Sequence, residues 1–189
     1  MTKNNSQQYQ KLFLITPRLI IRSYETSDAQ LLFNMITANR FHISDTMPLT
    51  VQNNKKLSDT INNIQERIIE THDGKNFVAG IFISGINKLI GQIAVMNIDW
   101  RVTKCELAYF VDADHQNRGY TTEAMQSILE YCFKTHQMKK VFLRIHPENK
   151  GSLRIAEKCG FAKHGIMHND FKTSDGKLVD LEYWELLSK

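Results

Sequence analysis

Apolar and polar side chains alternate at the start of the chain and then give way to helical spacing. Residues 17–24, PRLIIRSY, alternate and predict a strand with one face on a core. Apolar residues recur at helical spacing in residues 27–36, after a Ser-x-x-Gln capping-box pattern at Ser27, and again in residues 58–71. Both segments predict amphipathic helices. Residues 37–56 between them are polar and predict a loop with at most a short helical piece.

Short apolar runs separated by turn signals fill the second half of the chain. A hairpin signal, Gly-Ile-Asn-Lys, divides the apolar run of residues 76–100 into two strands. The later pattern predicts a strand at residues 104–112, a long helix at 115–133 and a strand at 139–147. A short helix closed by Gly160 follows at residues 152–161, and a final turn and strand at residues 175–187. We therefore expect one mixed α/β (α+β) domain over residues 11–189, preceded by a flexible polar tail at residues 1–10.

Composition narrows the class of protein without deciding its function. The 189 residues carry a net charge of +4 and seven histidines, which suits anionic ligands or acidic partners. Lys and Arg are scattered rather than clustered, so we expect no direct nucleic-acid binding. No apolar stretch is long enough to cross a membrane, and the polar opening is unlike a signal peptide. These features predict a cytoplasmic enzyme or binding domain.

Three cysteines, Cys105, Cys132 and Cys159, lie inside apolar patterns and form no regular framework. We interpret them as small buried residues in a reducing compartment. An acyl relay through Cys105 is the alternative, and no other feature of the sequence supports it.

The segment HQNRGYTTEAM joins a predicted strand to a predicted helix. Its spacing, Gln116-x-x-Gly119-x-Thr121, is typical of a loop whose backbone N–H groups hold an anion at a helix N-terminus. Taken alone, the same segment is equally compatible with an ordinary glycine turn that starts a helix.

Three segments in a fixed order give this loop its context. They are TPRLIIRSYETSDAQLLFNMI, LIGQIAVMNIDWRVTKCELAYFVDADHQNRGYTTEAM and HPENKGSLRIAEKCGF. Together they resemble the GNAT superfamily of acyl-CoA N-acyltransferases, and most closely its RimJ/RimL-like branch of ribosomal-protein N-terminal acetyltransferases. The resemblance runs from Thr16 to Leu187. It implies a mostly antiparallel twisted sheet flanked by helices, and an N-acetyltransferase that uses acetyl-CoA as cosubstrate.

The resemblance assigns the loop to the pyrophosphate of coenzyme A. The residues concerned are Gln116, Asn117, Arg118, Gly119, Tyr120, Thr121 and Thr122. Thr121 stands where the family has Gly or Ala. Its branched side chain either crowds a phosphate or donates a hydrogen bond to one, and we favour the hydrogen bond.

The resemblance also supplies candidates along the pantetheine arm and at the leaving sulfur. Asn149 matches an asparagine that bonds the arm. Ala156 stands where many relatives carry a tyrosine acid, so this motif provides no such tyrosine. Ser152 matches a serine of the RimL-like branch and is the candidate general acid, although it could also serve as the N-cap of its helix.

Strand alternation places Glu106, Ala108 and Phe110 on one face of the segment CELAYFVD. A glutamate in an apolar strand needs a partner, solvent or a functional role. Since relatives use a glutamate here as general base, Glu106 is the candidate base, with a satisfied structural carboxylate as the alternative. Phe110 and Val111 are expected to offer backbone groups to pantetheine and the thioester oxygen.

His164 and His168 have helical metal-ligand spacing, but their segment lacks a helical pattern, so we expect no metal site. The acceptor groove is expected along residues 39–70, where an acidic pocket would favour polyamines and an open groove a peptide. We predict transfer to a protein N-terminal α-amine. The alternatives are a small-molecule amine acceptor and, more distantly, a non-catalytic acyl-CoA-binding or nucleic-acid-binding module. Relatives of this branch are commonly dimers, so a homodimer is possible.

Overall fold

Eight strands form one sheet in a computed structural model that describes residues 11–188. Their order across the sheet is β1-β2-β3-β4-β5-β6-β8-β7, and every neighbouring pair is antiparallel except β5 and β6. The strands are β1 Phe13–Ile15, β2 Leu19–Ser23, β3 Phe77–Ile83, β4 Lys88–Asp99, β5 Lys104–Val111, β6 Lys140–Ile145, β7 Ala162–Lys172 and β8 Leu178–Leu187. The tail expected at residues 1–10 lies outside the described residues.

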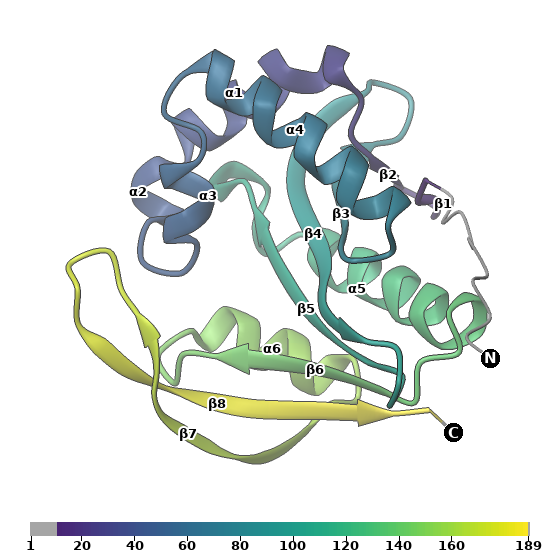
Figure 1. The fold of residues 1–189 in the computed structure, drawn as a ribbon, viewed down its shortest axis with the longest axis vertical. Helices are drawn as coiled ribbons and strands as arrows, with labels where there is room; N and C mark the ends of the chain where they lie inside the picture. The colour runs from purple at the N-terminus through teal and green to yellow at the C-terminus, as the bar shows by residue number, and fades with distance from the viewer. Residues whose placement is uncertain (1–10, 189) are drawn as a thin grey trace, which may run out of the picture.

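Helices cover both faces of this sheet (Figure 1). On one face α1 lies beside α4, with the short helices α2 and α3 between them in the chain, whereas α5 lies on the opposite face and α6 follows β6. The helical elements are η1 Thr26–Asp28, α1 Ala29–Ala38, α2 Arg40–Ile43, α3 Pro48–Gln52, α4 Leu57–His72, η2 Ala113–His115, α5 Tyr120–Glu130, the π-helical turn η3 Tyr131–Thr135, and α6 Lys150–Lys158. No helix within residues 11–188 is long and apolar enough to cross a membrane.

Two apolar cores lie on opposite faces of the sheet. The larger core packs the α5 stripe of Ala124, Met125 and Ile128 against strand residues such as Phe77 and Leu107. The second core packs α1 and α4 against the other face; its members include Tyr24, Leu32, Ile36, Ile64, Phe82 and Phe110. The alternation of β5 side chains between these cores follows the period of two that its sequence predicts.

The predicted fold class is confirmed; two local predictions need correction, and two strands were missed. Residues 37–56 hold two short helices rather than a loop with one helical piece. The capping box begins at Glu25, whose N–H donates to Asp28 Oδ2 at 2.8 Å, and not at Ser27. Strands β1 and β7 were not predicted. β7 is an edge strand with mostly exposed side chains, so it lacks the apolar alternation that marks a strand.

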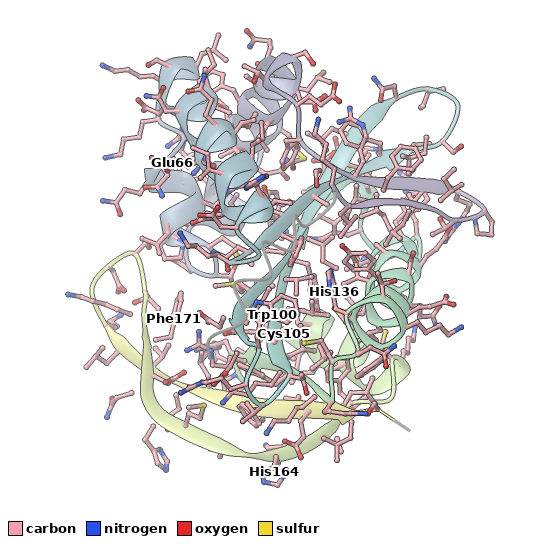
Figure 2. All side chains as sticks on the ribbon, turned by 45° about the vertical axis from the view of Figure 1, so that its right-hand side comes forward. Glu66, Trp100, Cys105, His136, His164 and Phe171 are labelled. Carbon is pink, nitrogen blue, oxygen red and sulfur yellow. The ribbon has the colours of Figure 1, made fainter. Side chains whose placement is uncertain are left out.

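The cysteines lie where the burial hypothesis places them, with Cys105 and Cys132 buried and Cys159 half-buried. Figure 2 shows Cys105 inside the molecule, and its Sγ lies 4.0 Å from that of Cys132. Cys105 is 0% exposed, so an acyl relay through its thiol would have no access to substrate. The relay alternative is therefore wrong.

Shortening Ile128 to alanine should cost about 2–5 kcal/mol of unfolding free energy, because a fully buried side chain of α5 leaves a cavity in the larger core. Ile69→Ala is the matched control, since Ile69 on α4 is 61% exposed and should cost well under 1 kcal/mol. Denaturant unfolding measures both. Equal losses would contradict the assignment of α5 as the main helix of this core.

Candidate active site

Strands β5 and β6 separate after a short stretch of parallel pairing. The ladder joins Lys104 to Lys140, Cys105 to Val141 and Glu106 to Phe142, and then stops. On its other side β5 stays paired with β4 as far as Val111. Figure 1 shows the two strands diverging from this point. Beyond Glu106 one edge of β5 is therefore open to a ligand.

The antiparallel ladder decides which backbone groups face this opened edge. The N–H of Asp112 donates to Ile90 of β4 at 2.8 Å, and hydrogen-bonded pairs recur every second residue in such a ladder. Phe110 therefore directs its backbone groups at β4, while Tyr109 and Val111 direct theirs into the opening. Of the two backbone sites expected here, Val111 fits and Phe110 does not; its side chain is buried in the second core.

The loop after β5 ends in a left-handed turn at the start of α5. Gly119 is the N-cap of the helix with φ of 80°, and Asn117 has φ of 58°. Within the described part of the chain, no hydrogen bond engages the backbone N–H groups of residues 117–122. Successive free N–H groups at the positive end of a helix form a concave site for an anion such as a pyrophosphate. The residues present thus fit the phosphates of coenzyme A.

Arg18 holds this loop in place, a contact that the sequence did not suggest. Its Nε donates to Glu123 Oε2 at 2.6 Å and its Nη1 to the Arg118 carbonyl at 3.0 Å. The Thr16 hydroxyl also donates to Glu123, at 2.6 Å. Burial raises the pKa of the Glu123 carboxyl, but these hydrogen bonds outweigh burial and leave that pKa below its ordinary value. The Arg18–Glu123 clamp offsets a negative charge beside the phosphate site and gives a loop carbonyl a hydrogen-bond donor.

The side chain of Thr121 lies on the buried face of α5, with only 8% of the residue exposed. It shares that face with Ala124 and Met125, which argues both against crowding of a phosphate above the helix end and against the hydrogen bond to a phosphate that we favoured from the sequence. Gln116 contacts the His42 ring of α2 through its side-chain amide. The ring of Tyr120 lies 4.7 Å from the Arg18 guanidinium carbon.

A second clamp fastens the α1–α2 corner to the start of the phosphate loop. The side chain of Asn39 donates to Asp112 Oδ1 and accepts from the Ala113 N–H, both at 2.9 Å. Asp112 also contacts His115 at 2.7 Å. Asn39 is 3% exposed, so the Asn39–Asp112 clamp is a buried connection between two segments far apart in the sequence.

Asn149, and not Ser152, is the N-cap of α6. Asn149 Oδ1 accepts the backbone N–H of Ser152 at 3.0 Å, which places Ser152 in the first turn of the helix. The alternative that Ser152 serves as the cap is therefore wrong, and its hydroxyl is available for another role. The Asn149 Nδ2 group makes no hydrogen bond within residues 11–188, which leaves it available to a pantetheine carbonyl.

Glu106 is buried and held by two partners, Asn97 from the preceding strand and Arg144 from β6. Its Oε1 accepts from Arg144 Nε at 2.9 Å and its Oε2 from Asn97 Nδ2 at 2.6 Å. Arg144 also donates to Asp170 at 2.8 Å. Burial lowers the pKa of Arg144, but the two carboxylates outweigh it and raise that pKa above its ordinary value. The network gives the buried Glu106 carboxylate hydrogen-bond partners on both oxygens. This is the arrangement that a structural role, the alternative to a role as base, requires.

This network borders a cleft of about 300 Å³ at the point where β5 and β6 separate. The cleft lies on the face of the sheet opposite α5, and its lining combines charged and aromatic side chains: Asn97, Lys104, Glu106, Phe142, Arg144, Met167 and Tyr183. The rings of Phe142 and Tyr183 stack with centroids 5.1 Å apart.

The two histidines of β7 each lie beside a carboxylate of β8. His168 contacts Asp180 at 2.8 Å and His164 contacts Glu185 at 3.5 Å, so each faces its own carboxylate. Figure 2 shows His164 pointing away from the sheet. No group of three or more metal-ligating side chains occurs in the part of the chain that the structure describes.

A parted strand pair that leads into an anion-binding helix start suits an acyl-CoA cosubstrate, with the phosphates at the helix and the acyl arm along the open strand edge. Comparison with known proteins agrees: a family model described as "Acetyltransferase (GNAT) domain" matches residues 18–162. The chain belongs to this family and is a GNAT N-acetyltransferase that uses acetyl-CoA as cosubstrate.

Individual relatives differ in what they acetylate. The chain is 30% identical over 141 residues to "Probable N-acetyltransferase YjcK" of Bacillus subtilis, covering 74% of this chain and 71% of that one. It is 21% identical to a spermidine N(1)-acetyltransferase of Vibrio cholerae (82% and 85% covered) and 22% identical to the ribosomal-protein-serine acetyltransferase of Escherichia coli (72% and 74% covered). The RimL ribosomal L7/L12 α-N-protein acetyltransferase, solved with coenzyme A, superposes with a TM-score of 0.86 at 16% identity, covering 94% and 98% of the two chains.

Gly119→Ala should weaken coenzyme A binding about tenfold or more. An alanine at a φ of 80° is strained, and its Cβ would lie 3.3 Å from Arg18 Nη2, so the N–H groups must shift. Gly85→Ala is the matched control: Gly85 has φ of 83° in the β3–β4 turn, with no atom within 4 Å of the added Cβ. Calorimetric titration with coenzyme A compares the two, and equal affinities would exclude this loop as the phosphate site.

Proposed function

We propose that this chain acetylates the N-terminal α-amine of a peptide or protein, as ribosomal-protein acetyltransferases do. The observation that carries the proposal is the charge of the cleft beside the parted strands. Residues of β4 to β8 line this cleft, and none of its lining residues comes from residues 39–70, where the sequence predicted the acceptor groove. Its lining holds Lys104 and Arg144 against Glu106 alone. A polyamine, whose every nitrogen is cationic, gains little in such a cleft, whereas a peptide terminus presents one amine followed by neutral amides.

The relatives support this choice only in part, because similar levels of identity link the chain to a spermidine and to a ribosomal-protein acetyltransferase. A small-molecule amine acceptor, such as an antibiotic or amino-acid derivative, is therefore the second candidate. The mixed charge of the cleft suits an acceptor that carries an anionic group beside its amine.

The chain's own residues prepare both substrates for direct attack in a ternary complex. The N–H groups of residues 117–122 bind the phosphates, and Asn149 and the opened edge of β5 hold the pantetheine arm. An N–H of that edge, at Tyr109 or Val111, can donate to the thioester oxygen as negative charge develops there. Fixed donors and fixed positions supply most of the acceleration in such a reaction.

Glu106 assists deprotonation of the acceptor through a bound water in this proposal. An α-amine has an ordinary pKa of ~7.7–8.0, so a substantial fraction is neutral at pH 7 and a modest base suffices. Because Arg144 and Asn97 hold the carboxylate in place, it can orient a water but is not free to move toward the amine. The Ser152 hydroxyl donates a hydrogen bond to the departing sulfur, which is a fair leaving group because an ordinary thiol pKa is ~8.5.

We also propose that the protein works in the cytoplasm, where its free cysteines stay reduced, and as a homodimer like relatives of its branch.

An acceptor screen tests the proposed function. With acetyl-CoA, peptides with a free N-terminus should be acetylated, and the same peptides with a blocked N-terminus should not, even when they contain lysine. Spermidine and aminoglycosides should be poor acceptors. Release of the coenzyme A thiol measures turnover, and mass spectrometry locates the acetyl group. Faster turnover of spermidine than of every free-terminus peptide would refute the proposal.

Lys104→Glu should shift any residual activity toward spermidine by making the cleft acidic.

Glu106→Gln should lower kcat/KM most at low pH, where the acceptor amine is protonated, and least above the α-amine pKa of ~8. Glutamine keeps the size of the side chain and one acceptor for Arg144 or Asn97. A pH–rate profile measured on the variant and the wild type checks this, with thermal unfolding to confirm that both are folded. A loss of equal size at every pH would assign Glu106 to structure alone.

A further inference from the structure

Tyr109 buries its hydroxyl beside the opened edge of β5. The side chain projects from the strand face that packs on the larger core, on the side of the sheet that α5 covers. Its oxygen is shielded from solvent and makes no hydrogen bond within the described residues. A buried hydroxyl without a partner costs free energy, and such groups in native proteins call for a structural or chemical reason.

Ser152 is the polar side chain that influences the pKa of this hydroxyl. Burial raises the pKa of Tyr109 to about 12, and the Ser152 hydroxyl acts in the opposite direction. Tyr109 packs in the same core as Leu153 and Ala156 of α6, the helix that carries Ser152 in its first turn. The two hydroxyls form no hydrogen bond in the structure. Hydrogen bonds at catalytic sites are often long before substrate binds and shorten in the complex.

The small side chain at Ala156 makes room for this arrangement. Ala156 lies one helical turn after Ser152 on α6, is fully buried, and belongs to the core against which Tyr109 packs. A tyrosine at position 156 would compete for the same space. With alanine there, the phenol of this part of the core comes from β5 and not from α6.

We propose that Tyr109 is a positioning residue that donates a hydrogen bond to Ser152 Oγ and so directs the Ser152 proton at the leaving sulfur. The inference rests on the proposed role of Ser152 and deepens it. As the acceptor nitrogen forms its bond to the acetyl carbon, the C–S bond breaks and sulfur takes its electron pair. The amine proton passes to water. Neither hydroxyl loses its proton; the pair stabilises the charge on sulfur.

The titration of bound coenzyme A tests this without any acceptor. In the wild-type complex the two hydroxyls should hold the pKa of the bound thiol below its ordinary ~8.5, and Tyr109→Phe should raise it by about one pH unit. Ultraviolet absorbance of the thiolate follows the titration. Tyr131→Phe is the control, because it removes another phenol whose pKa burial raises to about 12, on the η3 turn outside the site. An unchanged thiol pKa in Tyr109→Phe would overturn the proposal.

A double-mutant cycle on turnover separates positioning from packing. Tyr109→Phe should lower kcat about tenfold with little change in the KM for acetyl-CoA, and it should have no further effect once Ser152 is alanine. Independent, multiplying losses would overturn the proposal. Failure of the N-terminal acceptor assignment would appear instead as a different best acceptor in the screen, with the thiol titration unchanged.

Discussion

The early end of the β5–β6 ladder is the constraint on which the rest of the site depends. Two strands that stayed paired would consume their own backbone groups, and no ligand could reach them. Instead β5 keeps β4 as a neighbour along its whole length and loses β6 after Glu106, so it remains rigid while one edge stays open. The phosphate loop continues from the end of this strand, and α6 follows the strand that moved away. The phosphate loop and the open edge of β5, which would hold the two ends of coenzyme A, are therefore both positioned by the same strand.

Local patterns predicted the parts of this arrangement that local forces create. The turn at Gly119, the α5 stripe and the strand alternation around Glu106 all follow from side chains within a few residues of one another, and the sequence resemblance tied them to acetyl-CoA. The partners of Glu106 could not be predicted in this way. Asn97 comes from another strand and Arg144 from a third, so their meeting depends on sheet order and not on spacing.

The same reasoning explains the other differences between prediction and structure. Strand β7 has exposed side chains on both faces, so its pairing with β8 leaves no apolar alternation to detect. The Arg18–Glu123 clamp joins residues 105 positions apart and would pass in the sequence for two unremarkable surface charges. Asn149 as the cap of α6, with Ser152 within the first turn, differs from the alternative by three residues, a shift that only hydrogen-bond geometry resolves.

The Asn39–Asp112 clamp makes the start of the phosphate loop depend on a distant part of the chain. It bonds the corner between α1 and α2 to the segment that leads into the phosphate loop. Both hydrogen bonds are made by one side chain that is buried, so its loss would leave the Ala113 N–H and the Asp112 carboxylate without that partner. The geometry of the loop is therefore set in part by a residue that lies outside it.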